Sequence, residues 1–269
     1  MDQHQPSEES APEPGVVKAV VKTLRILEEL STVDNRGVTK IAGEAGMSKA
    51  TTFRFLSTLE REGYVRQDRD NGTYSLTLKL FEVASLVRQR RTRLDDIHPL
   101  LQDLAEGTGE TVHLATMEQD HLVYLDKIES NRALKVSMTS RVGRAAPLHC
   151  TAIGKVLLAH QDPDTQRDLL RRITLDRYTP TTITTQESLK EELKQIAGAG
   201  VALDKEEHEE GVYCIAAPIH NSQGEVRAAV SISMPSVRIT PEISATYQGM
   251  VQETAARISR ALGNGGWAD

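Results

Sequence analysis

The segment from Ser48 to Gln67, SKATTFRFLSTLEREGYVRQ, constrains the fold more than any other part of the sequence. Its first seven residues carry small hydroxyls, a lysine and an arginine, and apolar side chains then recur at helical spacing. We expect Ser48 to cap a helix that ends near Gly63. The residues expected to form its buried face are Ala50, Phe53, Leu56 and Leu59.

The sequence on either side predicts a winged helix-turn-helix over residues 16–78. A helical pattern covers 16–30, and a short helix follows that ends in a turn at Gly46. After Gly63, the stretch YVRQDRDNGTYSLT contains the pair Asn71-Gly72, which is the strongest short signal for a β-hairpin. This hairpin would be the wing.

Charge favours double-stranded DNA as the partner of this region. The whole chain has a formal net charge of −6, yet residues 16–95 contain 15 Lys and Arg against 10 Asp and Glu. Cations and hydroxyls at a helix start contact base edges and phosphates in helix-turn-helix proteins. The alternative is a three-helix packing module with solvated charges. The candidate DNA-contacting residues are Lys40, Ser48, Lys49, Thr51, Thr52, Arg54, Arg66 and Arg69.

The remainder of the chain predicts a second domain, so the fold class is α+β. Residues 1–15 are rich in Pro, Glu and Ser and are expected to be disordered. Residues 79–94 read as a linker helix, and 95–264 mix helices and strands. Within that part we expect a helix interrupted at Pro99 and a hairpin with its turn near Gln119-Asp120. Strands are expected at 211–220 and 226–235, followed by a helix over 241–262.

Several absences in the sequence indicate a cytoplasmic protein without cofactors. The N-terminal residues lack the basic and apolar regions of a signal peptide, and no apolar run approaches the length of a membrane span. Cys150 and Cys214 lie far apart and form no metal-binding spacing. We therefore expect a reduced setting, no membrane contact, no metal site and no cofactor.

Three features of the second domain suggest a binding site, and each has a purely structural alternative. Ser231 and Ser233 alternate with apolar residues on a strand, which suits either oxygen binding or a solvated sheet face. Cys214 occupies a comparable position on its strand. Small residues at the helix start near Ala152 leave amides accessible to a carboxylate, or allow close packing. The acidic run 204–210 reads as a solvated loop, with Asp204 at its edge able to accept a hydroxyl.

The chain resembles the IclR family of bacterial transcriptional regulators. The stretches that carry this resemblance are GVTKIAGEAGMSKATTFRFLSTLEREGYVRQDRDNGTYSLTLKLFEVA, SRVGRAAPLHCTAIGKVLLA, TTITTQESL and DKEEHEEGVYCIAAPIHNSQGEVRAAVSIS. The resemblance covers nearly all of residues 16–262. It implies a winged helix-turn-helix joined by a linker helix to a GAF-like effector-binding domain. It also implies a homodimer or tetramer that represses transcription.

The same resemblance implies a ligand. Within the family the sequence is most similar to the branch that represses pectin and hexuronate breakdown. This similarity implies 2-keto-3-deoxygluconate or a related sugar acid as effector. An aromatic or short keto acid is the alternative. The positions that match the family's effector-binding residues are Ala152, Ile153, Asp204, Cys214, Ser231 and Ser233.

Two other classes of function remain open at this stage. In a metal- or Cys-dependent enzyme, His113, His121, His149 or His208 would join a cysteine, but none of them has a recognised metal spacing. His149 and Cys150 are adjacent and point to opposite faces of an extended segment, so they form no nucleophile–base pair. A ligand-independent architectural protein would have no closed pocket. We expect no catalytic residue.

Overall fold

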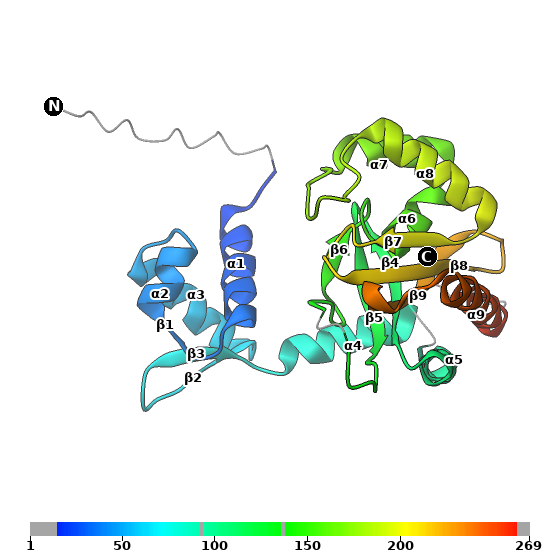
Figure 1. The fold of residues 1–269 in the computed structure, drawn as a ribbon. Helices are drawn as coiled ribbons and strands as arrows, with labels where there is room; N and C mark the ends of the chain where they lie inside the picture. The colour runs from blue at the N-terminus through cyan, green and yellow to red at the C-terminus, as the bar shows by residue number, and fades with distance from the viewer. Residues whose placement is uncertain (1–14, 92–93, 136–137, 263–269) are drawn as a thin grey trace. The chain divides into compact units, whose positions relative to one another are not determined.

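The computed structural model describes residues 15–91, 94–135 and 138–262, with the side chains of 87–91 excepted. The disordered tail expected over 1–15 lies outside the described residues, except for Gly15. The chain divides into two compact units, Met1–Val87 and Arg88–Asp269, and each is described here by itself (Figure 1).

The first unit has the three helices and the hairpin that the sequence predicts. Helices α1 (Lys18–Thr32), α2 (Val38–Glu44) and α3 (Lys49–Arg61) pack on a small antiparallel sheet. Its strands β1 (Arg36–Gly37), β3 (Thr73–Leu76) and β2 (Val65–Gln67) lie in that order. The core of the unit is formed by Ile26, Leu30, Ile41, Ala45, Leu56, Leu59, Val65 and Tyr74.

The buried face of α3 differs from the one expected. Thr52 is fully buried together with Leu56 and Leu59, whereas Phe53 is 52% exposed and Ala50 is exposed. Positions 52, 56 and 59 lie on one face of a helix with 3.6 residues per turn. The prediction used a constant spacing of three, and residues at that spacing rotate gradually away from one face. The expected buried face is therefore confirmed at Leu56 and Leu59 and wrong at Ala50 and Phe53, and Thr52 points into the core.

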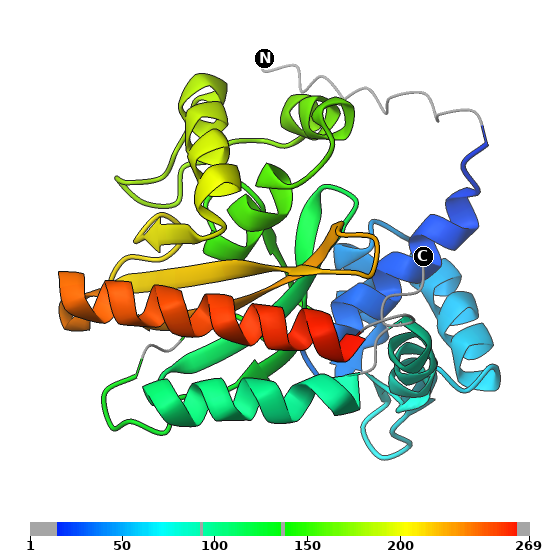
Figure 2. The same cartoon turned by 90° about the vertical axis from the view of Figure 1, so that its right-hand side faces the viewer.

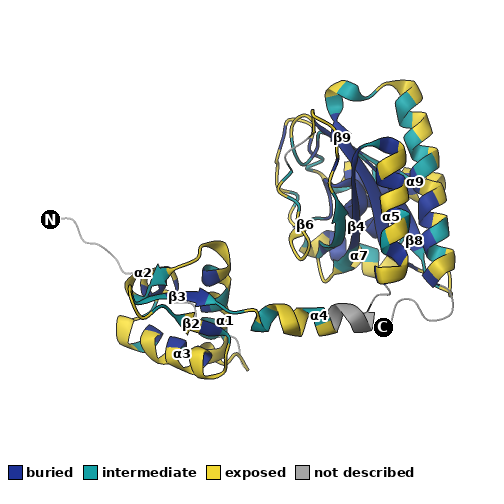
Figure 3. Cartoon of the chain, turned by 90° about the horizontal axis from the view of Figure 1, so that it is seen from below, coloured by how far each residue is buried: buried dark blue, intermediate teal, exposed yellow. Residues whose placement is uncertain are grey.

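Helix α4 (Lys79–Arg91) lies within the linker helix expected over 79–94, residues 92–93 lie outside the described residues, and Leu94 belongs to α5. The division between the two units falls within α4. Its described apolar side chains are unusually exposed, with Phe81 at 70% and Leu86 at 51% (Figure 3). The first unit therefore leaves the apolar side chains of this part of α4 uncovered.

The second unit is built on a six-stranded antiparallel sheet with the strand order β6-β5-β4-β9-β8-β7. The strands are β4 (Thr111–Glu118), β5 (His121–Ile128), β6 (Ala145–Pro147), β7 (Ala202–Lys205), β8 (Val212–His220) and β9 (Val226–Pro235). The expected hairpin with its turn at Gln119-Asp120 is confirmed.

Helices cover both faces of this sheet (Figure 2). Helices α5 (Leu94–Thr108) and α9 (Pro241–Leu262) form one apolar cluster with the sheet. Helices α6 (Ala152–Ala159), α7 (Pro163–Arg172) and α8 (Gln186–Ala199) form the other. A short 3-10 helix, Ser236–Arg238, follows β9.

Two local expectations about the helices need correction. The helix at α5 is not interrupted at Pro99, which lies inside it. A proline removes one backbone hydrogen bond, and the packing of Ile97 and Leu101 in the core holds the helix across this position. Helix α7 was not expected, although Asp162 caps it by accepting hydrogen bonds from the amides of Asp164 and Thr165.

No helix of the described residues is long and apolar enough to cross a membrane.

Helix α6 is the most deeply enclosed element of the second unit, since all eight of its residues are buried. Close packing against the preceding loop depends on Gly154. A Cβ atom at Gly154 would lie 2.5 Å from the carbonyl oxygen of Leu148 and 2.6 Å from its Cα. Both are backbone atoms that cannot rotate away, so this position excludes any side chain.

Gly154→Ala should therefore lower the free energy of unfolding, by about 1–3 kcal/mol for an overpacked position. The matched control is Gly198→Ala in α8, where a Cβ would meet no atom within 4 Å. That change should leave stability unchanged or raise it, because alanine favours a helix over glycine. Urea unfolding followed by circular dichroism measures both, and equal stability of the two variants would contradict the close packing.

Candidate functional site

The exposed start of α3 carries most of the residues expected to contact DNA. The Ser48 hydroxyl accepts a hydrogen bond from the Thr51 amide at 3.2 Å, which confirms Ser48 as the N-cap. Ser48, Lys49 and Arg54 are exposed and Thr51 is partly exposed. Thr52 is the exception, because its hydroxyl donates to the Ser48 carbonyl inside the fold.

The three remaining candidates for DNA contact are also exposed. Lys40 lies on α2, Arg66 on β2, and Arg69 in the loop that joins β2 to β3. This loop is longer than the two-residue turn that an Asn-Gly pair suggests. It is closed by a hydrogen bond from the Gly72 amide to the Asp68 carbonyl at 2.8 Å, and Gly72 adopts a φ of +70° that favours glycine. The hairpin itself is confirmed.

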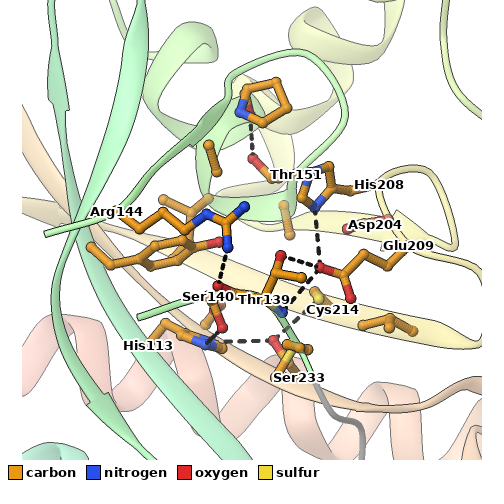
Figure 4. A pocket seen from close by; sticks show the side chains of 18 of the residues that line it. His113, Thr139, Ser140, Arg144, Thr151, Asp204, His208, Glu209, Cys214 and Ser233 are labelled. Carbon is orange, nitrogen blue, oxygen red and sulfur yellow. Dashed lines mark hydrogen bonds and ion pairs between the residues drawn. The ribbon is translucent and has the colours of Figure 1, made fainter. Parts of the chain in front are cut away.

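The second unit contains a pocket of about 230 Å³ between the sheet, the start of α6 and two loops (Figure 4). This volume is smaller than the roughly 300–1,000 Å³ of sites for drug-sized ligands. All six residues expected to bind an effector line it: Ala152, Ile153, Asp204, Cys214, Ser231 and Ser233. The fold thus brings together positions that are up to 81 residues apart in the sequence, from Ala152 to Ser233.

The register of the sheet creates the polar floor of this pocket. Asp204 on β7 pairs with Cys214 on β8, and Cys214 pairs with Ser233 on β9, so the three residues form a row across neighbouring strands. The Ser233 hydroxyl donates to Cys214 Sγ at 3.1 Å. Ser231 lies two residues along β9, opposite His113 on β4. Of the two alternatives left open by the sequence, the solvated sheet face is wrong, because both serines are 3% exposed.

Burial favours the neutral forms of the groups in the floor. It lowers the pKa of His113 to about 3, with the charge of Lys127 acting in the same direction. It raises the pKa of Asp204 to about 7, partly opposed by the hydrogen bond from the Glu207 amide. The pKa of the Cys214 thiol is also raised well above its ordinary value by burial, with Asp204 adding to the shift. The floor therefore offers hydroxyl, thiol and imidazole groups, together with a carboxyl whose pKa is about 7.

The start of α6 adds the groups that attract an anion. The Thr151 hydroxyl accepts from the Gly154 amide at 3.1 Å and donates to the Pro147 carbonyl at 2.8 Å, which fixes the first turn. Ala152 and Ile153 are the first two residues of α6, and the first amides of a helix have no acceptor inside it. Both residues line the pocket. The partial positive charge of the helix start therefore faces the cavity.

The acidic run after β7 is not the solvated loop that was expected. Glu207 is 6% exposed and lies 2.6 Å from the ammonium of Lys155, which is fully buried and also 3.1 Å from Glu192. Glu206 accepts a hydrogen bond from the Gly211 amide at 2.8 Å and so closes the loop. Glu209 lines the pocket. Glu210 alone keeps the exposed position expected for the run.

A segment before β6 closes the pocket from the other side. Ser140 Oγ lies 2.9 Å from His113 Nε2, and the Ser140 carbonyl accepts from Lys127 Nζ at 2.8 Å. The Thr139 carbonyl accepts from Arg144 at 2.8 Å. In Figure 4, Thr139, Ser140 and Arg144 lie above Cys214 and Ser233 of the floor.

Both units match models of one protein family. Residues 19–69 match the IclR helix-turn-helix domain, and residues 89–260 match the bacterial transcriptional regulator IclR C-terminal domain. The chain belongs to the IclR family of transcriptional regulators.

Individual relatives agree with this assignment. The chain is similar to the HTH-type transcriptional regulator KdgR of Escherichia coli K12, at 39% identity over 93% of this chain and 95% of KdgR. The crystal structure of the Thermotoga maritima IclR matches with a TM-score of 0.76 and 34% identity, covering 90% of this chain and 98% of the other. The crystal structure of an IclR homologue from Microbacterium hydrocarbonoxydans, complexed with 4-hydroxybenzoate, matches with a TM-score of 0.76 and 25% identity. The match covers 91% of this chain and 99% of the other.

The matched domains and relatives are those of transcriptional regulators and not of enzymes. The chemistry of the site agrees. Burial raises the pKa of both Cys150 and Cys214, so neither thiol is activated as a nucleophile. The described residues contain no group of three or more His, Cys, Asp or Glu side chains that could hold a metal ion.

Sequence reasoning missed most of the polar lining of the pocket. His113 had a usable signal, because it alternates with apolar residues on β4 and pairs in register with Ser231. Tyr124 on the neighbouring strand β5 lies 5.1 Å from the His113 ring. Thr139, Ser140 and Arg144 lie in an irregular segment whose position no periodic pattern predicts.

Asp204 gives a pH-dependent prediction. Its folded pKa of about 7 lies above its ordinary value of 3.8, so the folded protein binds the proton more tightly than the unfolded chain. The contribution of Asp204 to stability is complete below pH 3.8 and is lost as the pH rises through 7. The free energy of unfolding of Asp204→Asn, relative to that of the natural protein, should therefore increase as the pH rises from 5 to 8. Urea unfolding at both values measures this.

The control is Glu210→Gln, which removes an exposed acid from the same loop. Its free energy of unfolding should follow that of the natural protein at both pH values. A difference between Asp204→Asn and the natural protein that does not change with pH would contradict the raised pKa of Asp204.

Proposed function

We propose that this IclR-family chain is a repressor whose operator binding is controlled by a small organic acid in the pocket of the second unit. The observation that carries the proposal is the convergence of six side chains or amides from α6, β7, β8 and β9 on one small cavity. An architectural DNA-binding protein would not need such a cavity. The relatives support repression, because one of them is named the transcriptional repressor IclR of Escherichia coli K12.

For the DNA contacts, we infer that the start of α3 enters the major groove and the β2–β3 wing lies along the backbone. The residues proposed to contact the operator are Lys40, Ser48, Lys49, Thr51, Arg54, Arg66 and Arg69, all of which are at least partly exposed. Thr52 acts by holding the helix in place, since its side chain is buried. Each cation paired with a phosphate releases counterions, so binding should weaken steeply with salt.

For the effector, the pocket suits an acid with several oxygen atoms. The amides of Ala152 and Ile153 would bind its carboxylate, and the hydroxyls of Ser231 and Ser233 would contact its other oxygens. Asp204 would accept a ligand hydroxyl. A sugar acid such as 2-keto-3-deoxygluconate meets these requirements, and the similarity to KdgR supports this branch.

An aromatic acid is the second candidate, for one specific reason. The rings of Tyr124 and Tyr178 line the same pocket, and the homologue from Microbacterium hydrocarbonoxydans was crystallised with 4-hydroxybenzoate. The pocket floor favours the sugar acid, because its hydroxyl, thiol and imidazole groups need hydrogen-bonding partners that an aromatic ring lacks.

We infer that the chain acts as a homodimer or a dimer of dimers on a palindromic operator. The supporting feature is an exposed apolar stripe on α1, formed by Val17, Val20 and Leu24 at 61%, 55% and 52% exposure. A second copy of the chain would cover it. Val20→Glu with Leu24→Glu should shift the protein towards monomers in sedimentation velocity, whereas Arg25→Glu, at an exposed position off the stripe on the same helix, should not.

Two variants test the separation of functions. Arg54→Ala should weaken operator binding in a gel shift, by about 1–3 kcal/mol if the side chain contacts a base, and leave the affinity for the sugar acid unchanged in calorimetry. Ser231→Ala with Ser233→Ala should weaken the affinity for the sugar acid and leave operator binding unchanged. Equal loss of both activities in either variant would indicate misfolding, and a natural protein that ignores every sugar acid but binds 4-hydroxybenzoate would favour the aromatic candidate.

A further inference from the structure

Glu209 brings a carboxylate to the inside of the pocket (Figure 4). Its Oε1 accepts a hydrogen bond from the Thr139 hydroxyl at 3.0 Å and lies 3.9 Å from His208 Nδ1. Its other oxygen, Oε2, accepts no hydrogen bond from the residues that the structure describes. A carboxylate accepts up to about four hydrogen bonds, so Glu209 retains capacity for a ligand donor.

The backbone that carries Glu209 is held firmly. Glu206 adopts a φ of +63° and binds the Gly211 amide, which closes the loop from residue 206 to 211. The hydroxyls of Thr179 and Thr182 donate to the Glu206 and Glu207 carbonyls at 2.6 Å each. Glu207 is paired with Lys155 below. Glu209 therefore projects from a fixed frame, as a residue that selects ligands must.

The charges around the cavity are unevenly arranged. The α6 amides attract an anion, but the only charged base among the described lining residues is Arg144, because burial lowers the pKa values of His113 and His208. Arg144 is exposed and already donates to the Thr139 carbonyl. The α6 amides therefore form the enclosed place for an anionic group, and Glu209 adds a carboxylate to the lining.

We propose that Glu209 determines which acids the pocket accepts, by receiving a hydrogen bond from a distal hydroxyl and repelling a second anionic group. This inference rests on the proposed binding of a sugar acid with its carboxylate at α6. The ligand class is then a monoanionic acid with a neutral, hydroxyl-bearing tail. Acids that carry a phosphate or a second carboxylate on that tail are excluded, since like charges in a confined site cost binding energy.

Three ligands separate the parts of this proposal. 2-Keto-3-deoxygluconate carries the whole pattern, and its 6-phosphate adds a negative group at the tail. Pyruvate has the same carboxylate and keto group but no hydroxyls, so it occupies the α6 end alone. A hydrogen bond to a charged group contributes enough that its loss is expected to weaken binding about ten-fold or more.

The test is calorimetry with the full chain. Glu209→Gln should weaken 2-keto-3-deoxygluconate about ten-fold, strengthen its 6-phosphate, and leave pyruvate unchanged. The control Glu210→Gln, at the exposed neighbouring acid, should match the natural protein for all three ligands. Equal effects of Glu209→Gln on all three ligands, or no effect, would overturn the role of Glu209 while leaving the proposed function intact.

A second variant separates ligand selection from closure of the pocket. Thr139→Val keeps the carboxylate of Glu209 and removes its partner on the closing segment. It should preserve the preference for 2-keto-3-deoxygluconate over the 6-phosphate, and loss of that preference would make Glu209 a closing contact only. A natural protein that binds none of the three ligands would overturn the proposed function and this inference together.

Discussion

The ligand pocket depends on one buried ion pair. Lys155 lies on α6, the helix whose first amides face the cavity, and its ammonium is fully enclosed. Glu207 at 2.6 Å belongs to the loop that carries His208 and Glu209, and Glu192 at 3.1 Å belongs to α8. A buried charge without its partner costs several kcal/mol, so these three elements must stay together. The pair thus fixes the start of α6 against the acidic loop, and residues of both elements line the pocket.

The floor of the pocket is lined by groups that can exchange hydrogen bonds with neutral oxygens. Desolvation makes His113 a neutral imidazole and Asp204 a carboxyl that titrates near neutrality. Their hydrogen bonds run from Ser233 to His113 and on to Ser140 of the closing segment, at 3.4 and 2.9 Å. A hydroxylated ligand can enter such a network by exchanging hydrogen bonds, without moving a charge into an apolar environment.

The sequence predicted what local periodicity controls and failed where long-range packing decides. Strand alternation placed Ser231 and Ser233 on the pocket face, and the hydroxyl of Ser48 marked the start of α3. The acidic run was misjudged, because its partner Lys155 lies some 50 residues away and a lysine inside an apolar helix gives no local signal of its role. Thr52 was misplaced because its helix face was predicted from a spacing of three. The segment around Thr139 has no regular pattern to predict.

The proposed control of DNA binding by a ligand concerns α4, the helix that continues from one unit into the other. The stability of an isolated helix of 13 residues is marginal in water. Phe81 and Leu86 are exposed, so the first unit does not cover this part of α4. A ligand can shift an equilibrium only through an element that has two states of different ligand affinity. If a second copy covers α4 and the stripe on α1, assembly supplies the packing that gives α4 defined states. The response to the ligand and the assembly of the oligomer then depend on the same states of α4. A variant that abolishes assembly should therefore also remove the effect of the ligand on operator binding.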